Sequence, residues 1–289
     1  MNLPELQSPA EHMVAAIAAE IHDGDVLLEG IGTFLPTSAY LLAQATHAPR
    51  AIRLCPVGNV FVPEAHQLGL TGYEREVQAR AIHRFDYWDV IGSFLPGFVT
   101  GRRGAWKEFM RPAQVDSTGR TNNVVIGSME QPKVRLPGAA GLPDGVPAEP
   151  ALYMYVPRHN RKTFVKKLDF VSAPGLLEGA KPHMIVTDLA VMRFAVDGVL
   201  EVQTLMPGAT REQVQDETEF QLRFRNELKA HRPLDANQLR VLRDEVDPMS
   251  LRDLELFPAQ GRLARIKALV AKEPSYVELR KKLASLLSS

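Results

Sequence analysis

A glycine turn near the N-terminus is suited to hold a ligand through its backbone. Gly30-Ile31-Gly32 follows an apolar stretch and precedes a helical pattern, where backbone N–H groups at a helix start can contact a phosphate or another anion. The dinucleotide-binding fingerprint would need a third glycine three residues further on, and that position is Leu35. The turn therefore predicts either a structural tight turn or backbone contact with a ligand.

A second candidate is a run of small residues framed by prolines, at positions 136–143 (LPGAAGLP). Small side chains let backbone N–H groups approach a ligand closely, which is the geometry that an oxyanion hole needs. A plain surface loop would have a similar composition. The members of this run that we name as candidate ligand contacts are Gly138, Ala139, Ala140 and Gly141.

The remaining reactive side chains give weaker signals. The eight histidines show no metal-ligand spacing, and the sequence contains neither a Gly-x-Ser-x-Gly elbow nor a Walker A loop. Cys55 ends an apolar stretch, so a buried structural thiol is the favoured interpretation over a nucleophile. Acids follow that stretch at Glu64, Glu74 and Glu76, and we expect them in solvated loops. We therefore predict no metal site.

The elements around these residues indicate an α/β fold. Ser8, Pro9 and Glu11 form a capping box that begins a helix. A strand at 25–29, the glycine turn, a helix at 37–46 and a strand at 51–55 follow. Further strands are expected at 124–127, 152–156, 168–172, 184–187 and 199–205, and helices at 210–220, at 235–245 and from 260 to the end. This order predicts an open, mostly parallel sheet with flanking helices.

Composition limits the class of protein. The 289 residues carry 34 basic and 34 acidic side chains, and zero net charge disfavours nucleic acid or an anionic membrane as the main partner and favours association. A single cysteine excludes an internal disulfide framework and favours a reducing cytoplasm. We see neither a targeting segment nor an apolar run long enough to span a membrane.

The C-terminal stretch differs from the rest of the chain. From residue 262 it contains seven Lys or Arg against two Glu, with apolar residues at helical spacing. We expect an amphipathic helical extension at 258–289 that docks on the body or on a partner, after one α/β domain at 1–257.

Several blocks, taken in order, resemble the β-type subunit of the family I coenzyme A transferases, in the glutaconate CoA-transferase branch. The similarity runs over roughly residues 10–257 and implies that family's fold. The blocks that carry it are 30–36 (GIGTFLP), 114–122 (QVDSTGRTN), 138–141 (GAAG), 167–175 (KLDFVSAPG) and 185–188 (IVTD). The resemblance implies that Gln114 and Asn122 are polar groups that bind substrate or order a loop. They are weaker candidates than the backbone groups of the two glycine-rich segments.

The end of the core is most similar to one subgroup, the CoA-transferase-like hydrolases that open a carbocyclic ring in bacterial steroid degradation. Residues 207–210 (PGAT) and 245–253 (EVDPMSLRD) carry this second resemblance. An arginine of that subgroup's small-residue loop is matched here by Ala140, which implies a different substrate.

One departure from the family concerns the nucleophile. Family members use a glutamate of the β-type part, which forms an enzyme-bound glutamyl thioester. Counted from Leu35, that position falls at Pro56, and the glycine that follows it in the family motif is present as Gly58. Proline has no nucleophile, so the resemblance implies that the catalytic acid lies elsewhere, as on the α subunit in the steroid-ring hydrolases.

The resemblance thus implies a cytoplasmic β-type subunit that acts on an acyl-CoA together with an α-type subunit or a self-associated copy, with the CoA thioester as substrate and no bound cofactor. Two reactions remain open: CoA transfer to a carboxylic acid, and hydrolytic C–C ring opening of a cyclic acyl-CoA. A non-catalytic acyl-CoA-binding subunit and a stand-alone enzyme of another class are the alternatives.

Overall fold

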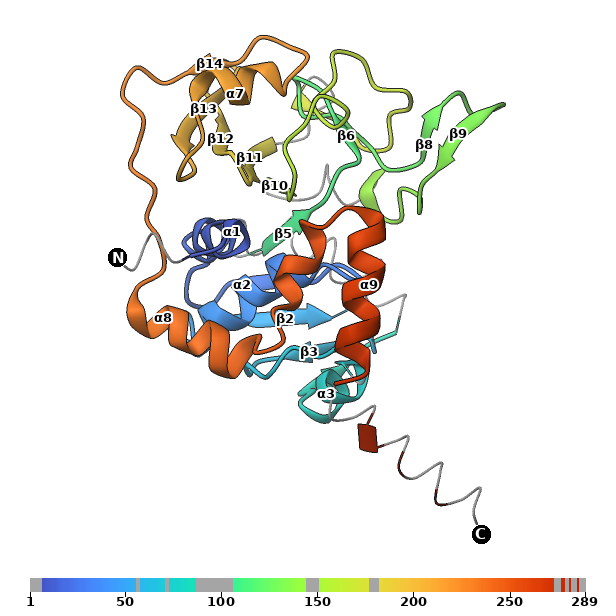
Figure 1. Ribbon diagram of the computed structural model, residues 1–289, viewed down its shortest axis with the longest axis vertical. Coiled ribbons are helices and arrows are strands. Elements are labelled where there is room, and N and C mark those ends of the chain that lie inside the picture. The colour runs from blue at the N-terminus through green and yellow to red at the C-terminus, as the bar shows by residue number, and fades with distance from the viewer. Residues whose placement is uncertain are drawn as a thin grey trace. The chain divides into compact units, whose positions relative to one another are not determined.

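The computed structural model describes residues 7–55, 58–70, 73–86, 106–143, 151–176 and 182–272, with positions 277, 278, 281 and 285 (Figure 1). The chain divides into two compact units. The first is formed by residues up to 24, 29–85 and 234 onwards, and the second by residues 25–28 and 86–233.

The second unit is built on a mixed sheet with the strand order β14-β13-β12-β11-β10-β5-β1. Pairing is parallel from β1 through β5 and β10 to β11, antiparallel from β11 through β12 to β13, and parallel again to β14. The strands are β1 (Val26–Leu28), β5 (Trp106–Met110), β10 (Leu152–Val156), β11 (Pro182–Thr187), β12 (Ala190–Phe194), β13 (Leu200–Leu205) and β14 (Arg223–Phe224).

Burial in this sheet follows the sequence pattern of each strand. Every residue of β10 is buried, as expected for a central parallel strand covered on both faces. In β13 buried and half-buried residues alternate, so that only one face is in the core. Met154, Ile185, Met192 and Val202 from four of the strands meet Phe164 in the core of this unit.

Among the described residues of the second unit, two short hairpins and one helix accompany the large sheet. β6 (Gln114–Val115) pairs with β7 (Thr121–Asn122), and β8 (Val125–Gly127) pairs with β9 (Pro132–Arg135), which forms the green hairpin of Figure 1. The helix α7 (Arg211–Asp216) begins at Thr210, whose side chain accepts a hydrogen bond from Gln213 N.

The first unit combines a small antiparallel sheet with helices. β2 (Ile52–Cys55) pairs with β3 (Val60–Val62), which pairs with β4 (His83–Arg84). The helix α2 is anchored to this sheet, because Gln44 Nε2 donates to the carbonyls of Ala51 and Val62. The helical segments are α1 (Pro9–Ala18), α2 (Phe34–Ala45), α3 (Tyr73–Ala79), α8 (Ala236–Arg240), a π-helical turn (Val241–Val246), a 3₁₀ helix (Leu251–Glu255) and α9 (Ala259–Val270).

The helix α1 starts at the expected capping box and is tied to the far end of the chain. Ser8 Oγ accepts from Glu11 N, and the Glu11 carboxylate accepts from Ser8 N. The same carboxylate forms ion pairs with Arg243 and Arg252, and Arg252 also pairs with Asp247. These ion pairs, in which Glu11, Arg252 and Asp247 are buried, hold the segment around the 3₁₀ helix against α1.

The predicted α/β class is confirmed, and most expected elements are present with shifted ends. The strand expected at 168–172 is wrong, because these residues form a loop. Asp169 N donates to Gln114 Oε1, and Ser172 N donates to the carbonyl of Thr121. The polar groups of this loop thus form hydrogen bonds with β6 and β7 rather than with a strand of the large sheet.

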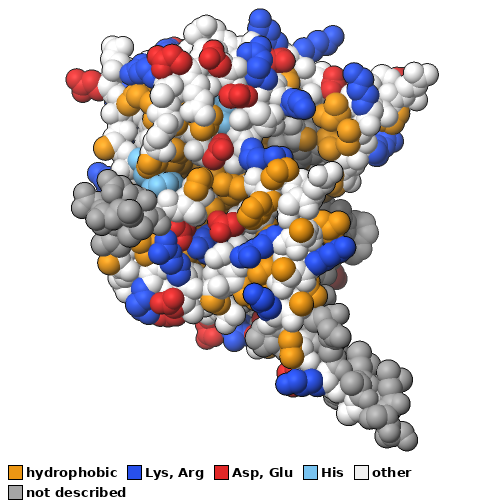
Figure 2. Space-filling view, viewed as in Figure 1, with side chains coloured by type: hydrophobic (Ala, Val, Ile, Leu, Met, Phe, Trp, Pro, Cys, Tyr) orange, Lys and Arg blue, Asp and Glu red, His pale blue; other side chains and the backbone are white. Residues whose placement is uncertain are grey.

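Acidic and basic side chains are interspersed on the face of the molecule that Figure 2 draws, in keeping with the zero net charge. Of the helices that the structure describes, none combines the length and apolar character needed to cross a membrane. The expected extension at 258–289 contains α9, in which Leu269 is buried; the division of the chain at residue 257 remains a prediction.

Candidate functional site

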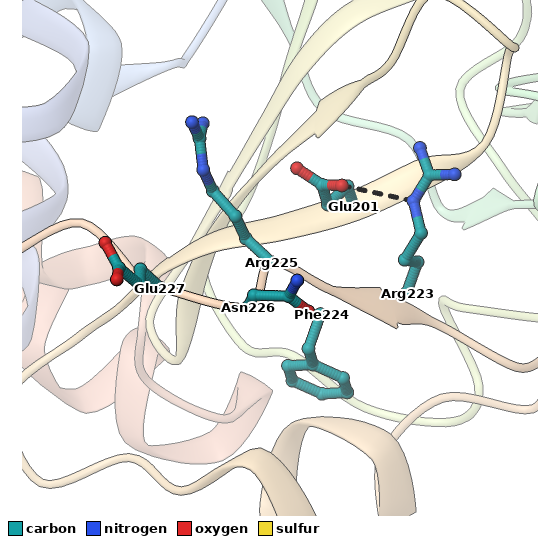
Figure 3. A pocket seen from close by; sticks show the side chains of 6 residues that line it. All are labelled: Glu201, Arg223, Phe224, Arg225, Asn226 and Glu227. Carbon is teal, nitrogen blue, oxygen red and sulfur yellow. Dashed lines mark hydrogen bonds and ion pairs between the residues drawn. The ribbon is translucent and has the colours of Figure 1, made fainter.

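Two cavities lie among the described residues of the second unit. One, of about 780 Å³, is open and polar and lies at β14 (Figure 3). It is lined by Glu201, Arg223, Phe224, Arg225, Asn226 and Glu227. The other, of about 520 Å³, is lined by Arg120, Val124, Ala139, Pro143, Phe170, Val171, Ser172, Ala173 and Pro174.

Two of the charged side chains that line the β14 cavity, Arg223 and Glu201, are paired with each other. Arg223 donates to both Asp197 and Glu201, the latter pair being drawn in Figure 3. Arg211 donates to the carbonyls of Arg225 and Asn226 and lies 5.3 Å from the centroid of the Phe224 ring. Arg211 thus binds the chain just after the edge strand β14, so its contacts have a structural explanation.

The 520 Å³ cavity is the stronger candidate because three segments that the sequence analysis singled out meet there. Arg120 belongs to block 114–122, Ala139 to the small-residue run, and positions 170–174 to block 167–175. Its lining is mainly apolar and includes one arginine, as in ligand pockets that bury an apolar chain beside one charged group. We call it the Arg120 cavity.

The position of Arg120 is fixed by a neighbouring carboxylate. Its Nε and Nη2 atoms lie 2.8 and 2.7 Å from Oδ2 of Asp116, and Asp116 Oδ1 accepts from the backbone N–H and hydroxyl of Thr118. Gly175 approaches the backbone here so closely that a Cβ atom would lie 2.6 Å from the Thr118 carbonyl oxygen. The close approach of the 167–175 loop to Thr118 and Arg120 therefore favours glycine at position 175.

Gln114 and Asn122, predicted to bind substrate or order a loop, are buried and hydrogen-bonded to each other. Asn122 Nδ2 donates to Gln114 Oε1 at 2.7 Å, and Gln114 Nε2 donates to Asp169 Oδ2 at 3.1 Å. Asp169 Oδ2 also accepts from Gly127 N. Both side chains thus connect the hairpins to the 167–175 loop, and a direct contact with substrate stays a prediction.

The small-residue loop adopts an unusual backbone at the predicted positions. Gly138 has φ +119° and donates its N–H to the Asn123 carbonyl, and Ala140 has φ +47°. A left-handed alanine is uncommon, and such residues concentrate at functional sites. Gly141 has open space where a side chain would be. The loop therefore places small residues and a strained peptide beside Ala139 in the cavity wall.

The other predicted glycines lie in the first unit. Glu29 N donates to the Leu54 carbonyl, which places the turn at Gly30 beside the end of β2. A side chain at Gly30 would meet the Thr33 methyl at 2.8 Å, and Gly32 has φ +71°. Gly58, with φ +90°, starts the return into β3. Pro56, where the family resemblance puts the glutamate, lies outside the described residues.

A buried cluster at the end of β2 was not predicted. Arg53 is fully buried, and its Nη1 lies 2.9 Å from Glu29 Oε2. The Cys55 thiol donates to the same oxygen at 3.3 Å, and Arg53 Nε donates to Gln44 Oε1 at 2.8 Å. The sequence did carry a signal for it, because Glu29 and Arg53 each interrupt an apolar strand pattern. Buried charges require partners, so two such interruptions indicate an ion pair.

Burial shifts the titration of several groups. Burial, together with the charge of Arg53, lowers the pKa of His66 to about 4. Burial likewise lowers the pKa of His159 to about 3, and its ring stacks on Phe164 and contacts the hydroxyls of Thr187 and Thr218. Burial raises the pKa of Asp188 to about 6. Both histidines are therefore neutral at physiological pH.

Within the described part of the chain, no group of three or more His, Cys, Asp or Glu side chains could hold a metal ion. The residues that line the Arg120 cavity suit an organic ligand with an apolar portion and an anionic portion.

Comparison with known proteins gives a consistent result. Residues 103–217 match the family model described as "Coenzyme A transferase". The chain is 33% identical over 239 residues to the β-type subunit of 3-oxoadipate CoA-transferase from Pseudomonas knackmussii, covering 77% of this chain and 86% of that protein. It is 26% identical to the cholesterol ring-cleaving hydrolase IpdB subunit of Mycobacterium tuberculosis, covering 87% and 99%.

A solved structure agrees with these relatives. The decarboxylase AibA/AibB matches with a TM-score of 0.74 and 26% identity, covering 85% of this chain and 97% of that one. The same decarboxylase has also been solved with one cysteine replaced by valine, alanine, serine or asparagine.

Proposed function

The chain belongs to the coenzyme A transferase family as a β-type subunit, and on this basis we propose that it acts on an acyl-CoA together with an α-type subunit. The reaction we favour is transfer of CoA from an acyl-CoA to a carboxylic acid. The observation that carries the acyl-CoA assignment is the Arg120 cavity, where three family-like blocks converge.

The chemistry of this cavity suits part of an acyl-CoA. Phe170, Val171 and Pro174 offer an apolar surface to an acyl or pantetheine chain, and the Arg120 guanidinium offers a charged partner to a carboxylate or phosphate. The backbone at Ala139–Gly141 supplies N–H groups for a thioester oxygen. Substrate contacts at Gly30, Gly32, Gly58, Gln114 and Asn122 are part of the same proposal.

A second candidate function is cleavage of a C–C bond in an acyl-CoA. The observation that favours it is the end of β2, where the family glutamate position is Pro56 and the neighbouring described acid, Glu29, is held by Arg53. Relatives with this kind of activity include a ring-cleaving hydrolase and a decarboxylase. The carboxylate for either reaction would come from the α-type subunit.

One experiment separates these reactions. The purified complex with an α-type subunit is incubated with acyl-CoA and an acceptor carboxylate in ¹⁸O-labelled water. Formation of a new acyl-CoA from the acceptor supports transfer, label in a product carboxylate supports hydrolysis, and released CO₂ supports decarboxylation. Acyl-CoA binding without turnover indicates a non-catalytic subunit, and turnover by the isolated chain overturns the two-subunit proposal.

The Arg120 cavity is tested separately by calorimetry of acyl-CoA binding. Arg120→Gln removes the charge and leaves a shorter polar side chain, and we expect at least a tenfold loss of affinity. Arg50→Gln, at an exposed ion pair with Asp23, is the matched control. Equal affinity of the two variants would contradict the assignment.

A further inference from the structure

The β8–β9 hairpin projects from the second unit with most of its length in solvent (Figure 1). Residues 128–131 of its turn and all four residues of β9 are exposed. Within the hairpin, all of which the structure describes, Val125 is the one buried residue. A two-stranded hairpin is marginally stable in water unless it packs against another element. This hairpin therefore lacks, in the chain alone, the packing that such a segment needs.

Apolar side chains occupy positions on this hairpin that face solvent. Val134 is 49% exposed and lies opposite Ile126 in the strand pairing, and Met129 in the turn is 43% exposed. Arg135 Nη1 donates to Met129 Sδ at 3.5 Å, and Lys133 and Arg135 flank Val134 in β9. Protein interfaces typically combine an apolar centre, in which Met and Arg are enriched, with a polar rim. The hairpin therefore has the composition of a docking surface.

The base of the hairpin leads directly to the Arg120 cavity. Beyond the end of β9, Leu136 N donates to the Val124 carbonyl, so the two chain segments stay paired up to the small-residue loop. Val124 and Ala139, on either side of this pairing, both line the cavity. Val171, another lining residue, is itself 48% exposed. A protein that covers the hairpin would therefore lie next to the cavity.

We infer that the β8–β9 hairpin is a docking arm for the α-type subunit, which is thereby brought beside the Arg120 cavity. The role of the cavity rests on the proposed function, in which an acid of the α-type subunit must approach the acyl-CoA. The docking itself rests on the hairpin. An α-type subunit is the partner expected for a β-type chain of this family.

The charges of the hairpin distinguish this partner from a second copy of the chain. Residues 128–135 carry two cations, Lys133 and Arg135, and one anion, Glu130. In a two-fold interface between copies the same patch meets itself, so the surplus of positive charge would be repelled. A different chain can present acidic side chains to Lys133 and Arg135 around an apolar recess for Val134. The arm therefore fits a heterologous partner with an acidic rim.

Hydrogen–deuterium exchange of the full chain, alone and in complex with a co-expressed α-type subunit, tests the docking without any variant. We expect the amides of residues 126–135 to exchange at least tenfold more slowly in the complex. Residues 195–198, which join β12 to β13, are the internal control and should exchange equally in both samples. Equal exchange of the hairpin in the two samples overturns the inference. Protection that appears in the isolated chain as its concentration rises assigns the hairpin to a second copy, which also overturns it.

A matched pair of variants measures the contribution of the arm. Val134→Asp places a charge at the apolar centre, and we expect the Kd for the α-type subunit to rise at least tenfold. Val196→Asp makes the same exchange in the turn between β12 and β13, where Val196 is fully exposed, and should change the Kd less than twofold. Met129→Glu provides a second variant of the arm if Val134→Asp fails to fold. Equal Kd values for the arm variants and Val196→Asp contradict the docking.

The outcomes separate this inference from the proposed function. A complex whose hairpin is protected but which neither binds nor converts acyl-CoA refutes the proposed function and supports the docking arm. A complex that converts acyl-CoA while its hairpin exchanges as in the isolated chain supports the function and refutes the docking arm.

Discussion

Arg252 and Glu11, 241 residues apart in the sequence, form a buried ion pair of 2.8 Å within the first unit. Their side chains are 3% and 2% exposed, and Arg252 also pairs with Asp247. The pair joins the N-terminal helix to the 3₁₀ helix after the π-helical turn. A contact of this kind stabilises the fold only while both partners are present.

Replacing Arg252 with methionine is therefore expected to lower the free energy of unfolding by about 3–5 kcal/mol, because the buried Asp247 carboxylate loses its cation and Glu11 keeps only Arg243. Chemical denaturation followed by circular dichroism measures the change. Arg50→Met opens an exposed pair with Asp23 and should cost less than about 1 kcal/mol. Similar losses in the two variants would show that the Arg252 cluster adds nothing beyond a surface pair.

The same cluster predicts acid sensitivity. Burial alone would raise the pKa of Glu11, but hydrogen bonds from Arg243 and Ser8 and the charge of Arg252 outweigh it and lower the pKa to about 2. A lowered pKa means that the ionised form stabilises the fold above the unfolded value near 4.5, and that this stabilisation is lost as the pH falls from there toward 2. Glu11→Gln should flatten that part of the stability curve; an unchanged slope would contradict this explanation.

The pKa of Asp188 is shifted in the direction opposite to that of Glu11. Burial raises its pKa to about 6 although its side chain accepts a hydrogen bond from His159 N at 2.7 Å. The folded state therefore prefers the protonated form, and stability is lost as the pH rises from about 4 to 6. Asp188→Asn keeps the acceptor oxygen, and at pH 7.5 we expect a gain of about 1–3 kcal/mol that vanishes at pH 3.5. A loss at pH 7.5 would disprove it.

A larger side chain on the wall of the Arg120 cavity should block ligand binding there. Ala139→Leu places a larger apolar side chain in the cavity, and we expect acyl-CoA affinity to fall at least tenfold with little change in melting temperature. Ala259→Leu, at the exposed first turn of α9, is the same exchange away from the cavity and should leave binding unaltered. Calorimetry compares the two, and retained affinity in the first variant would exclude ligand binding at this wall.

Two glycines of the neighbouring segments should respond differently to the same substitution. In Gly175→Ala the new Cβ would lie 2.6 Å from the Thr118 carbonyl oxygen and 2.8 Å from Arg120 Cγ, so we expect a loss of about 1–3 kcal/mol and weaker acyl-CoA binding. Gly141→Ala meets nothing within 4 Å and should be nearly neutral. Thermal unfolding of both variants gives the comparison.

Local patterns in the sequence predicted the elements that depend on local interactions. The capping box at Ser8, the helix that starts near Thr210 and the buried strand β10 follow from short-range hydrogen bonding and apolar runs. The strand expected at 168–172 failed because its apolar residues line a cavity while Asp169 and Ser172 bond to the hairpins. Hydrogen bonds between residues far apart in the chain produce no periodic pattern in the sequence from which they could be predicted.

The candidate site, like the fold, could be predicted from the sequence only where local patterns identify it. Blocks 114–122, 138–141 and 167–175 were identified in the sequence, but their convergence on one cavity needed the structure. The Glu29–Arg53 pair was missed because each residue, taken alone, looks like an interruption of an apolar strand. Only their separation of 2.9 Å explains why two charges are tolerated in a core.

The order in which the chain is synthesised gives the Glu11–Arg252 pair a further consequence. The first unit is assembled from both ends of the chain, whereas residues 86–233 of the second unit are continuous. On the ribosome, α1 emerges with Glu11 long before Arg243, Asp247 and Arg252 exist to surround it. The second unit can therefore acquire most of its sheet during translation, while the first must wait with an unpaired carboxylate until the C-terminal segment has left the exit tunnel.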